Sequence, residues 1–592
     1  MTKPNAPVFA PYLKGAGHAT LTTLTTHASR SLLLACTVAL AACSSTPLPQ
    51  WPASTSPVSS QAATQTSANT PSSSTAPARP VVSVSPVAPS AALEPLPYSA
   101  AIAQLFPDPS ERYSTPSLSE GRSHFTTNAE LAELLRNISQ PGSNSTVRLG
   151  IIDSGSSQNG NPIYALVATK AKATSPLALD ESGRPSVMVV AGQQGTDAAA
   201  TEAMLVLIKE LDSGGLLEPL LNSIHIIFVP RANPDGFAKG TAATADGTDL
   251  RFDHLRLQTP EARFLAKLAR DYRPSVLLDA GEFAAIQPTL QRYNAVRAND
   301  VGLQYAVTPN GHEFVTKAAR EWLHQPVSDS LSHAGMRVDW AFDAAGSNAA
   351  SGFAMGTTEP TTLRNVSSLK NVASLEVRSR GSDLGRTHLQ RRVHSHVKVM
   401  TTVLEQAAQR AADLRQVQTF VTRDIASHAC RNTLVVQSEP RTEQRDVTLV
   451  DAASAQLVQR KTAWTSSLNI GVPRTRHHAC GYWLSANAVQ AAERLGMLGV
   501  IVQRVAELSP LDAEIYQAST GSSATASISL TRSNFEAAPG SYYVSMNQPL
   551  AFLAAAALEP DTPYSFYRTG VLAQLNEAAR VVTLPKIVFE ED

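Results

Sequence analysis

One stretch of the chain restricts its fold more than any other, and it runs from Ser186 to Glu202 with the sequence SVMVVAGQQGTDAAATE. Its first residues are almost all apolar, as in a strand that is buried on both faces of a sheet. A polar turn follows, and the run after Asp197 has the composition of the first turns of a helix. A buried strand that passes through a short turn into a helix is the building unit of an α/β fold.

The same alternation of buried strands and amphipathic helices continues along the chain. Short apolar runs at Val187–Val190, Ile224–Val229 and Val276–Leu278 are bounded by turn residues and are predicted to be strands. One helix is predicted from about Asp197 to Leu211, and another begins at Thr259-Pro260, where a capping residue precedes a proline at the first helical position. A third helix is predicted from about Arg386 to Leu414. We therefore predict an α/β fold in which a mixed, mostly parallel sheet carries helices on both faces.

Length and charge limit the number of domains and the kind of partner. The chain has 592 residues, with 49 basic and 49 acidic side chains, so its formal net charge is +0. This balance argues against nucleic acid as a main partner, because nucleic-acid-binding domains carry an excess of Lys and Arg. Shifts in composition predict four segments: a signal peptide over 1–42, a Ser/Thr/Pro/Ala-rich linker over 43–97, the α/β domain over 98–414, and a smaller, mixed but mostly β domain over 415–592.

The N-terminal segment is predicted to export the chain and to anchor it. Arg30 is followed by the apolar run Leu32–Ala42, which is too short to span a membrane and has the parts of a secretory signal. The end of this run, Leu-Ala-Ala-Cys, resembles the lipobox of bacterial lipoproteins, and the resemblance implies that Cys43 is lipidated. Ser44 after it implies the outer membrane, with the folded part facing the periplasm. A plain cleaved signal with an incidental Cys43 is the alternative.

Polar clusters follow three of the predicted strands, at the edge of the sheet where α/β proteins bind ligands. They read Gly-Gln-Gln-Gly-Thr-Asp over 192–197, Asn-Pro-Asp-Gly over 233–236 and Asp-Ala-Gly-Glu over 279–282. With a fourth segment, Ser-Leu-Glu-Val-Arg over 374–378, their order and spacing resemble the zinc carboxypeptidase family of the carboxypeptidase A type. That family carries His-x-x-Glu in the first turn, then Asn-Pro-Asp-Gly, Asp-x-Asn-Arg and Asp-x-His, and finally a Glu before an Arg-rich helix.

The resemblance implies a zinc peptidase, but the residues at its metal positions are poor ligands. The family binds zinc through two His and one Glu and leaves one position open for water. The corresponding positions here are Gln194, Asp197 and Gly281, that is, an amide, a shorter carboxylate and no side chain at all. An amide oxygen and one carboxylate cannot hold Zn²⁺ as two imidazoles and a carboxylate do. We therefore predict that zinc, which is expected for the family, is not bound here.

The other site residues implied by the family are only partly retained. Glu376 stands at the position of the catalytic general base, and a structural ion pair with Arg378 is its alternative interpretation. Arg251 is the displaced remnant of the pair that holds the terminal carboxylate of the substrate, unless that pair is lost altogether. Arg364 and Asn365 are retained in the loop before Glu376 and are predicted to bind substrate. The segment 237–249 contains no Arg, so the arginine that stabilises the oxyanion is missing.

These residues predict a cell-envelope lipoprotein with a metallocarboxypeptidase-like domain that binds peptides, with hydrolysis weakened or lost. The expected partners are C-terminal peptides or the stem peptides of the cell wall. The alternative is an active zinc carboxypeptidase with non-standard ligands, for which His254, His312 and Glu313 are the nearest candidates in the sequence. As loop residues, these two histidines are more simply interpreted as solvated side chains.

The folded part of the chain contains two cysteines, Cys430 and Cys480, both in the predicted C-terminal domain. In an exported protein they are predicted to form a disulfide. Each of them ends a His-Ala-Cys triplet, so a Cys₂His₂ zinc site is the alternative. Elsewhere in this domain, short strands are predicted over 433–437, 446–450, 499–503 and 527–530 and one helix over 488–495, and no chemistry is predicted.

Overall fold

The computed structural model describes residues 98–591, except for 141–145, 347–350 and 519–527. The predicted signal peptide, Cys43 and the predicted linker lie outside the described residues. The described residues all belong to one compact unit. None of the helices in the described residues is both long and apolar enough to cross a membrane.

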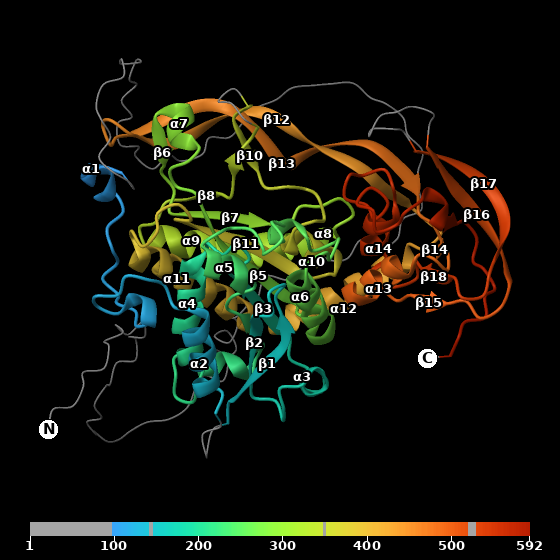
Figure 1. Ribbon diagram of the computed structural model, residues 1–592, viewed down its shortest axis with the longest axis horizontal. Coiled ribbons are helices and arrows are strands. Elements are labelled where there is room, and N and C mark those ends of the chain that lie inside the picture. Colours follow the sequence, from blue (N-terminus) through green and yellow to red (C-terminus); the bar gives the residue numbers. More distant parts are fainter. Residues whose placement is uncertain (1–97, 141–145, 347–350, 519–527, 592) are drawn as a thin grey trace, which may run out of the picture. The chain divides into compact units, whose positions relative to one another are not determined.

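An eight-stranded sheet forms the centre of the α/β region (Figure 1). Its strands lie in the order β1-β2-β4-β3-β5-β11-β7-β8, and the neighbours β4, β3, β5 and β11 are parallel. The pairs β1–β2, β2–β4 and β11–β7 are antiparallel, so the predicted mixed, mostly parallel sheet is confirmed. The strands are β1 Arg148–Ser156, β2 Pro162–Thr169, β3 Ser186–Ala191, β4 His225–Val229, β5 Val276–Phe283, β7 Val301–Tyr305, β8 Val338–Trp340 and β11 Ala373–Arg380.

Two sets of helices pack against this sheet. Helices α4 (Ala198–Glu210) and α11 (Leu389–Gln409) contact each other and strand β5, while α10 (Leu363–Leu369) contacts β5 and β11 and α6 (Pro260–Tyr272) contacts β1. The start of α6 is as predicted, with Pro260 at the first helical position. The hydroxyl of Thr259 caps this helix by accepting from the amide of Ala262 at 3.2 Å.

The helix predicted from about Arg386 to Leu414 is in fact two helices. Helix α11 ends at Gln409, and helix α12 (Ala411–Ser427) begins after Arg410, whose backbone has φ −102° and ψ 17°. The predicted domain boundary at residue 414 therefore falls inside α12. No Gly or Pro marks the break, so the sequence offered no signal for it.

A second sheet joins strands from both of the predicted domains. Its order is β6-β12-β13-β10-β9, and the long antiparallel hairpin of β12 and β13 forms its centre (Figure 1). The sequence predicted two short strands over 433–437 and 446–450, where the structure has the single strand β12. The middle of β12 consists of exposed, mostly polar residues, so the alternation of apolar and polar residues that predicts a strand is absent there. The strands are β6 Ala295–Arg297, β9 Asp343–Ala344, β10 Phe353–Met355, β12 Thr433–Asp451 and β13 Leu457–His477.

The C-terminal region forms a third sheet, with the order β15-β18-β14-β19-β16-β17. The helix predicted there is confirmed as α13 (Val489–Leu498). The strand predicted over 499–503 is wrong, because Gly499 has φ 91° and ends α13 in the left-handed conformation. The other elements are β14 Gly481–Leu484, β15 Gln503–Arg504, β16 Ser509–Ala518, β17 Ile528–Ala537, β18 Tyr542–Ser545, α14 Ala551–Leu558 and β19 Ala578–Val581.

Candidate active site

The turn after β3 is held against the Asn-Pro-Asp-Gly segment by close backbone contacts. A Cβ atom at Gly195 would lie 2.0 Å from the carbonyl carbon of Gly236, so only glycine fits at this point. Asn233 accepts a hydrogen bond from the amide of Gly236 at 2.8 Å and donates one to the carbonyl of Gln193 at 3.2 Å. It thereby caps helix α5 (Pro234–Lys239) and fixes the turn that carries two of the predicted metal positions.

The three predicted metal positions converge at the carboxyl ends of β3 and β5. Asp197 immediately precedes α4 and is 3% exposed. A Cβ atom at Gly281 would lie 2.9 Å from Asp197 Oδ2, so these two positions face each other. Gln194 lines the same cavity, whose volume is about 20 Å³. This volume accommodates about one water molecule.

The chemistry of these three residues does not fit zinc. Protein zinc sites use imidazole, thiolate and carboxylate ligands, whereas here one carboxylate stands beside an amide and a glycine. Burial, together with the negative charge of Glu282, raises the pKa of Asp197 well above its usual value and favours its neutral form, which is a poor ligand. Within the described residues, no group of three His, Cys, Asp or Glu side chains is placed to hold a metal ion.

Glu376, the predicted general base, lies on β11 in the wall of the same cavity and is 6% exposed. The guanidinium of Arg364 binds its Oε2, and that of Arg378 binds its Oε1. Burial alone would raise the pKa of Glu376, but the positive charges of Arg378 and Arg364 outweigh burial and lower it. Both carboxylate oxygens are therefore engaged in ion pairs within the protein, which reduces the basicity of Glu376.

Gln193 and Asp279 line another wall of this cavity, and Gln193 connects Asp279 to a third polar side chain, His254. Gln193 donates to Asp279 Oδ1 at 2.6 Å, and Gln193 Oε1 lies 2.6 Å from His254 Nε2. Burial and the charge of Glu376 raise the pKa of Asp279 to about 7, while burial and the charge of Lys370 lower the pKa of His254 to about 3. His254 is only 3% exposed, so its interpretation as a solvated loop histidine is wrong. Its neutral ring is committed to Gln193.

The other two candidates for replacement ligands lie elsewhere. His312 Nε2 is 3.2 Å from Asp424 Oδ2, and its Nδ1 accepts from the amide of Phe314 at the start of α8 (Glu313–Ala318). Glu313 is the first residue of that helix and is exposed. Neither residue lines the cavity around Asp197.

The residues predicted to bind substrate already have partners within the protein. Arg251 lines the cavity, but its Nη2 donates to Asp249 Oδ2 at 2.6 Å and its Nε to Oδ1 at 3.1 Å. Arg364 binds Glu376, as described. Asn365 is fully buried and donates to two backbone carbonyls, those of Thr357 and Glu359, each at 2.8 Å. The structure thus brings Arg251 and Arg364 to the site and places Asn365 behind it, as a support for the loop.

Two residues of the site were not among the predicted site residues. Gln193 and Asp343 became apparent only from their contacts: Gln193 joins Asp279 to His254, and Arg378 donates to Asp343 Oδ2 at 2.9 Å. Asp343 lies on β9, far from β11 in the sequence, so no local sequence pattern predicts its pairing with Arg378. The pairing of Arg378 with Glu376 can be predicted, because the two residues are two apart on one strand and alternate residues of a strand share one face.

The predicted disulfide between Cys430 and Cys480 is present, with a separation of 50 residues. It joins the segment before β12 to the segment after β13, so it ties the two ends of the long hairpin. His428 and His478 lie close by, with ring centroids 6.5 Å apart. Because the two sulfur atoms are bonded to each other, they are not available as the thiolate ligands of the alternative zinc site.

Comparison with known proteins agrees with the motif order. Residues 141–281 match the family model described as zinc carboxypeptidase. Carboxypeptidase 2 of Trichophyton rubrum is 23% identical over 427 residues, which cover 69% of this chain and 78% of that relative. Carboxypeptidase D of Mus musculus is 32% identical over 129 residues, or 20% of this chain and 9% of that protein.

Two solved structures are also similar to this chain. A metallo-carboxypeptidase from Burkholderia cenocepacia is 13% identical, with a TM-score of 0.34 over 46% of this chain and 68% of that chain. Carboxypeptidase A from Helicoverpa armigera is 15% identical, with a TM-score of 0.36 over 52% of this chain and 80% of that chain.

The sequence match and the order of the motifs define the class as metallocarboxypeptidase-like. The chain carries a domain of the zinc carboxypeptidase family, as its motifs predicted. Within that family, it is distinguished by an amide, a buried carboxyl and a glycine where the metal ligands are expected.

Proposed function

We propose that this protein is a cell-envelope lipoprotein whose carboxypeptidase-like domain binds peptides and no longer hydrolyses them. The observation that carries the loss of hydrolysis is the state of Glu376, since both of its carboxylate oxygens are bound by arginines. A general base must be free to accept a proton from water within hydrogen-bond reach. Here both oxygens of Glu376 form ion pairs with arginines, and the cavity of about 20 Å³ has room for about one water molecule and not for a substrate.

The absence of the family's zinc ligands also argues for a loss of hydrolysis. Zinc supplies the acidified water and polarises the scissile carbonyl in this family. Gln194, Asp197 and Gly281 offer one carboxyl group, whose pKa is raised by burial. A poor ligand set and a general base engaged in ion pairs would each weaken the family's reaction.

A groove beside the closed cavity is the surface that we assign to peptide binding. Its volume is about 790 Å³, and it opens next to Gly195 and Thr196, in the turn after β3. Phe125 and Phe237 give it apolar walls, and Arg386 lies at one side. A groove of this size with aromatic walls suits an extended peptide. C-terminal peptides and the stem peptides of the cell wall are the ligands that we propose.

The test measures hydrolysis and binding separately on the purified protein. The purified protein is incubated with peptides that have free C-termini, with and without added zinc, and released amino acids are quantified. Binding of the same peptides is measured by calorimetry. We expect binding without release of amino acids. A chelator-sensitive release that Glu376→Gln abolishes would instead establish an active carboxypeptidase with non-standard ligands.

The lipid anchor is tested at Cys43. We propose that the mature chain begins at this residue and carries lipid on it, facing the periplasm from the outer membrane. Mass spectrometry of the N-terminal fragment from cells would show the mass of the acyl chains, and Cys43→Ser would remove both the lipid and the membrane association. A mature N-terminus elsewhere, without lipid, would show a plain cleaved signal.

A further inference from the structure

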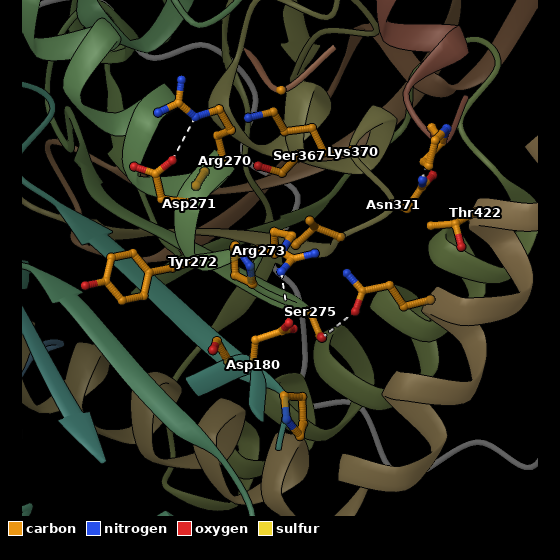
Figure 2. Close-up of a pocket in the computed structure, with 18 of the residues that line it drawn as sticks. Asp180, Arg270, Asp271, Tyr272, Arg273, Ser275, Ser367, Lys370, Asn371 and Thr422 are labelled. Atoms are coloured by element: carbon orange, nitrogen blue, oxygen red, sulfur yellow. Dashed lines mark hydrogen bonds and ion pairs between the residues drawn. The ribbon is translucent and has the colours of Figure 1, made fainter. Parts of the chain in front are cut away.

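A second cavity, shown in Figure 2, lies at the amino ends of the central strands. The cavity around Glu376 lies at the opposite edge of the sheet. Ser186 at the start of β3, Ser275 before β5 and Val372 before β11 all line the second cavity. Its volume is about 490 Å³. This falls within the range of small-molecule sites, and it is far larger than the cavity around Glu376.

The charge of this cavity differs from that of the whole chain. Acidic and basic side chains are equal in number over the sequence, whereas the cavity is lined by five basic residues and two acidic ones. Figure 2 shows the two ion pairs that use up the acidic residues, Arg270 with Asp271 and Arg273 with Asp180. A third cation, Arg184, donates to the carbonyl of Leu221 at 2.6 Å. The two basic residues of the lining that remain are Lys370 and Arg415.

Lys370 is a cation of this cavity that forms no ion pair within the described residues. Its side chain is partly buried at the end of α10, and among the described residues its ammonium has neither a carboxylate nor a hydrogen-bond acceptor as a partner. Burial and the positive charge of Arg270 lower the pKa of Lys370 to about 8, and the more weakly acting negative charge of Asp271 opposes this shift only in part. An ammonium that is removed from water beside a like charge is unfavourable unless an anion joins it.

Arg415 completes the cationic side of the cavity. It comes from α12, and its Nη1 lies close to Gly183, at 3.2 Å from where a Cβ would stand. No carboxylate within the described part of the chain lies within ion-pair distance of this guanidinium. Lys370, directly after α10, and the exposed Arg415 of α12 therefore line the same cavity, and neither forms an ion pair with a carboxylate of the described residues.

The far wall of the cavity is apolar and fixed. It includes Leu498, Ile501 and Leu550 from the C-terminal region, and Ile501 is 55% exposed. Gln548 holds this wall in place by accepting from the amide of Ile501 at 2.8 Å and donating to its carbonyl at 3.2 Å. The side-chain amide of Asn371 donates to the carbonyl of Pro549 at 3.0 Å, and its buried Oδ1 has no hydrogen-bond partner among the described residues.

We propose that this cavity binds a small organic anion, with its carboxylate or phosphate group held by Lys370 and Arg415 and its apolar part against Leu498, Ile501 and Leu550. The unpaired cations supply the charge that such a group requires, and the volume leaves room for more than an inorganic ion. The site is independent of the proposed peptide groove, because it lies at the other edge of the sheet and shares no residue with it.

The proposal is tested by calorimetric titration of the full chain with four probes: benzoate, phenyl phosphate, inorganic phosphate and the neutral analogue benzamide. We expect saturable binding of benzoate or phenyl phosphate, and the stronger of the two identifies the preferred anionic group. Inorganic phosphate should bind about tenfold more weakly, because it lacks the apolar part, and benzamide should not bind. Equal binding of benzamide and benzoate, or no saturable binding of either organic anion, overturns the proposal.

Variants locate the binding site. Lys370→Gln should weaken binding by about tenfold, whereas Lys370→Arg, which keeps the charge, should stay within about threefold of the wild type. Lys267→Gln is the matched control, because Lys267 is an exposed lysine of α6 that does not line the cavity, and it should change nothing. Circular dichroism checks that each variant is folded. Unchanged affinity in folded Lys370→Gln, or an equal loss in the Lys267 variant, would contradict the assignment.

Discussion

At the carboxyl ends of β3, β5 and β11, charged side chains face one another in a cavity of about 20 Å³. At the amino ends of the same strands, basic side chains surround a cavity of about 490 Å³, and two of them lack a counter-charge within the described residues. The first end is where the family performs its chemistry, and here Glu376 is neutralised by two arginines. The second end has no role in the family resemblance, yet it has the space and the unpaired charge of a binding site.

The site at which a family performs its chemistry and the site at which a given member has space to bind a ligand can therefore lie at different ends of the same strands. A scaffold retains its turns and caps because folding requires them, as Asn233 and Gly195 show, while its reactive groups can be converted into internal ion pairs. Glu376 forms buried ion pairs with Arg364 and Arg378, and we expect these pairs to contribute to the stability of the fold. The first prediction measures this contribution.

The largest effect is expected from Arg364→Met. The substitution leaves a buried carboxylate, Glu376, with only one of its two guanidinium partners, and breaking a buried pair in this way costs about 3–5 kcal/mol. The free energy of unfolding is measured with urea. Arg251→Met is the control, because its pair with Asp249 is partly exposed and should contribute less than about 1 kcal/mol. Similar losses in the two variants would mean that the closed site is not held by its buried ion pairs.

The second prediction concerns the hairpin that borders the closed site. In β13, Ser467 Oγ accepts a hydrogen bond from Gln304 at 3.2 Å, and Gln304 pairs with Glu376 across β7 and β11. Replacing Cys430 and Cys480 by Ser removes the disulfide that ties this hairpin. Because the disulfide closes a loop of 50 residues, we expect a loss of about 2–4 kcal/mol in the free energy of unfolding.

The matched control for this variant is the reduced wild-type protein, which should unfold at the same urea concentration. A loss below about 1 kcal/mol would show that the hairpin is held by its strand pairing alone.

The third prediction concerns pH at the amino ends of the strands. His225 is fully buried at the start of β4, where its ring is hydrogen-bonded to the hydroxyls of Thr169 and Ser182, at 2.7 and 2.6 Å. Burial, and secondarily the charge of Arg184, lowers its pKa to about 4. The unfolded chain, with a pKa of about 6.5, binds more protons between these values, so stability is full above about pH 6.5 and is lost as the pH falls toward 4.

We expect His225 to lower the free energy of unfolding by about 2 kcal/mol between pH 7 and pH 5. The measurement is urea unfolding at a series of pH values, with His225→Gln as the variant that removes this titration. If the variant and the wild type lose stability with the same slope, His225 does not carry the effect.

The smallest effect is expected at the wall of the open cavity. Gly499 has φ 91°, and a Cβ there would lie 3.3 Å from Cγ of Arg270, so Gly499→Ala should cost about 1 kcal/mol. Gly496→Ala is the control three residues earlier in the same helix, where a Cβ meets nothing within 4 Å. It should stabilise the protein by about 0.5–1 kcal/mol. Effects of the same sign in both variants would contradict this description of the wall.

Much of the central fold could be predicted from the sequence, because its signals are local. The apolar runs at β3, β4 and β5 and the cap at Thr259 lie in the residues that form those elements. The break at Arg410 and the single long strand β12 could not be predicted, since one lacks a breaking residue and the other lacks an alternating pattern in its middle. In both cases tertiary contacts override local preference.

The candidate site divides in the same way. The substitutions at the metal positions could be read directly from the motifs, since Gln194, Asp197 and Gly281 occupy known places in them. The two ion pairs of Glu376 could not be predicted, because Arg364 and Arg378 lie on different elements. Neither spacing nor composition specifies which carboxylate oxygen each arginine binds. The cavity beside Lys370 could not be predicted from the sequence, because its lining residues come from six separate stretches of the chain.

The central claim is that the carboxypeptidase-like site is closed by internal ion pairs and does not hold zinc. Native mass spectrometry of the purified protein, after incubation with excess zinc and removal of unbound metal, tests it most directly. We predict a mass without a stoichiometric metal ion. A single zinc ion per chain that Asp197→Ala removes would contradict the account.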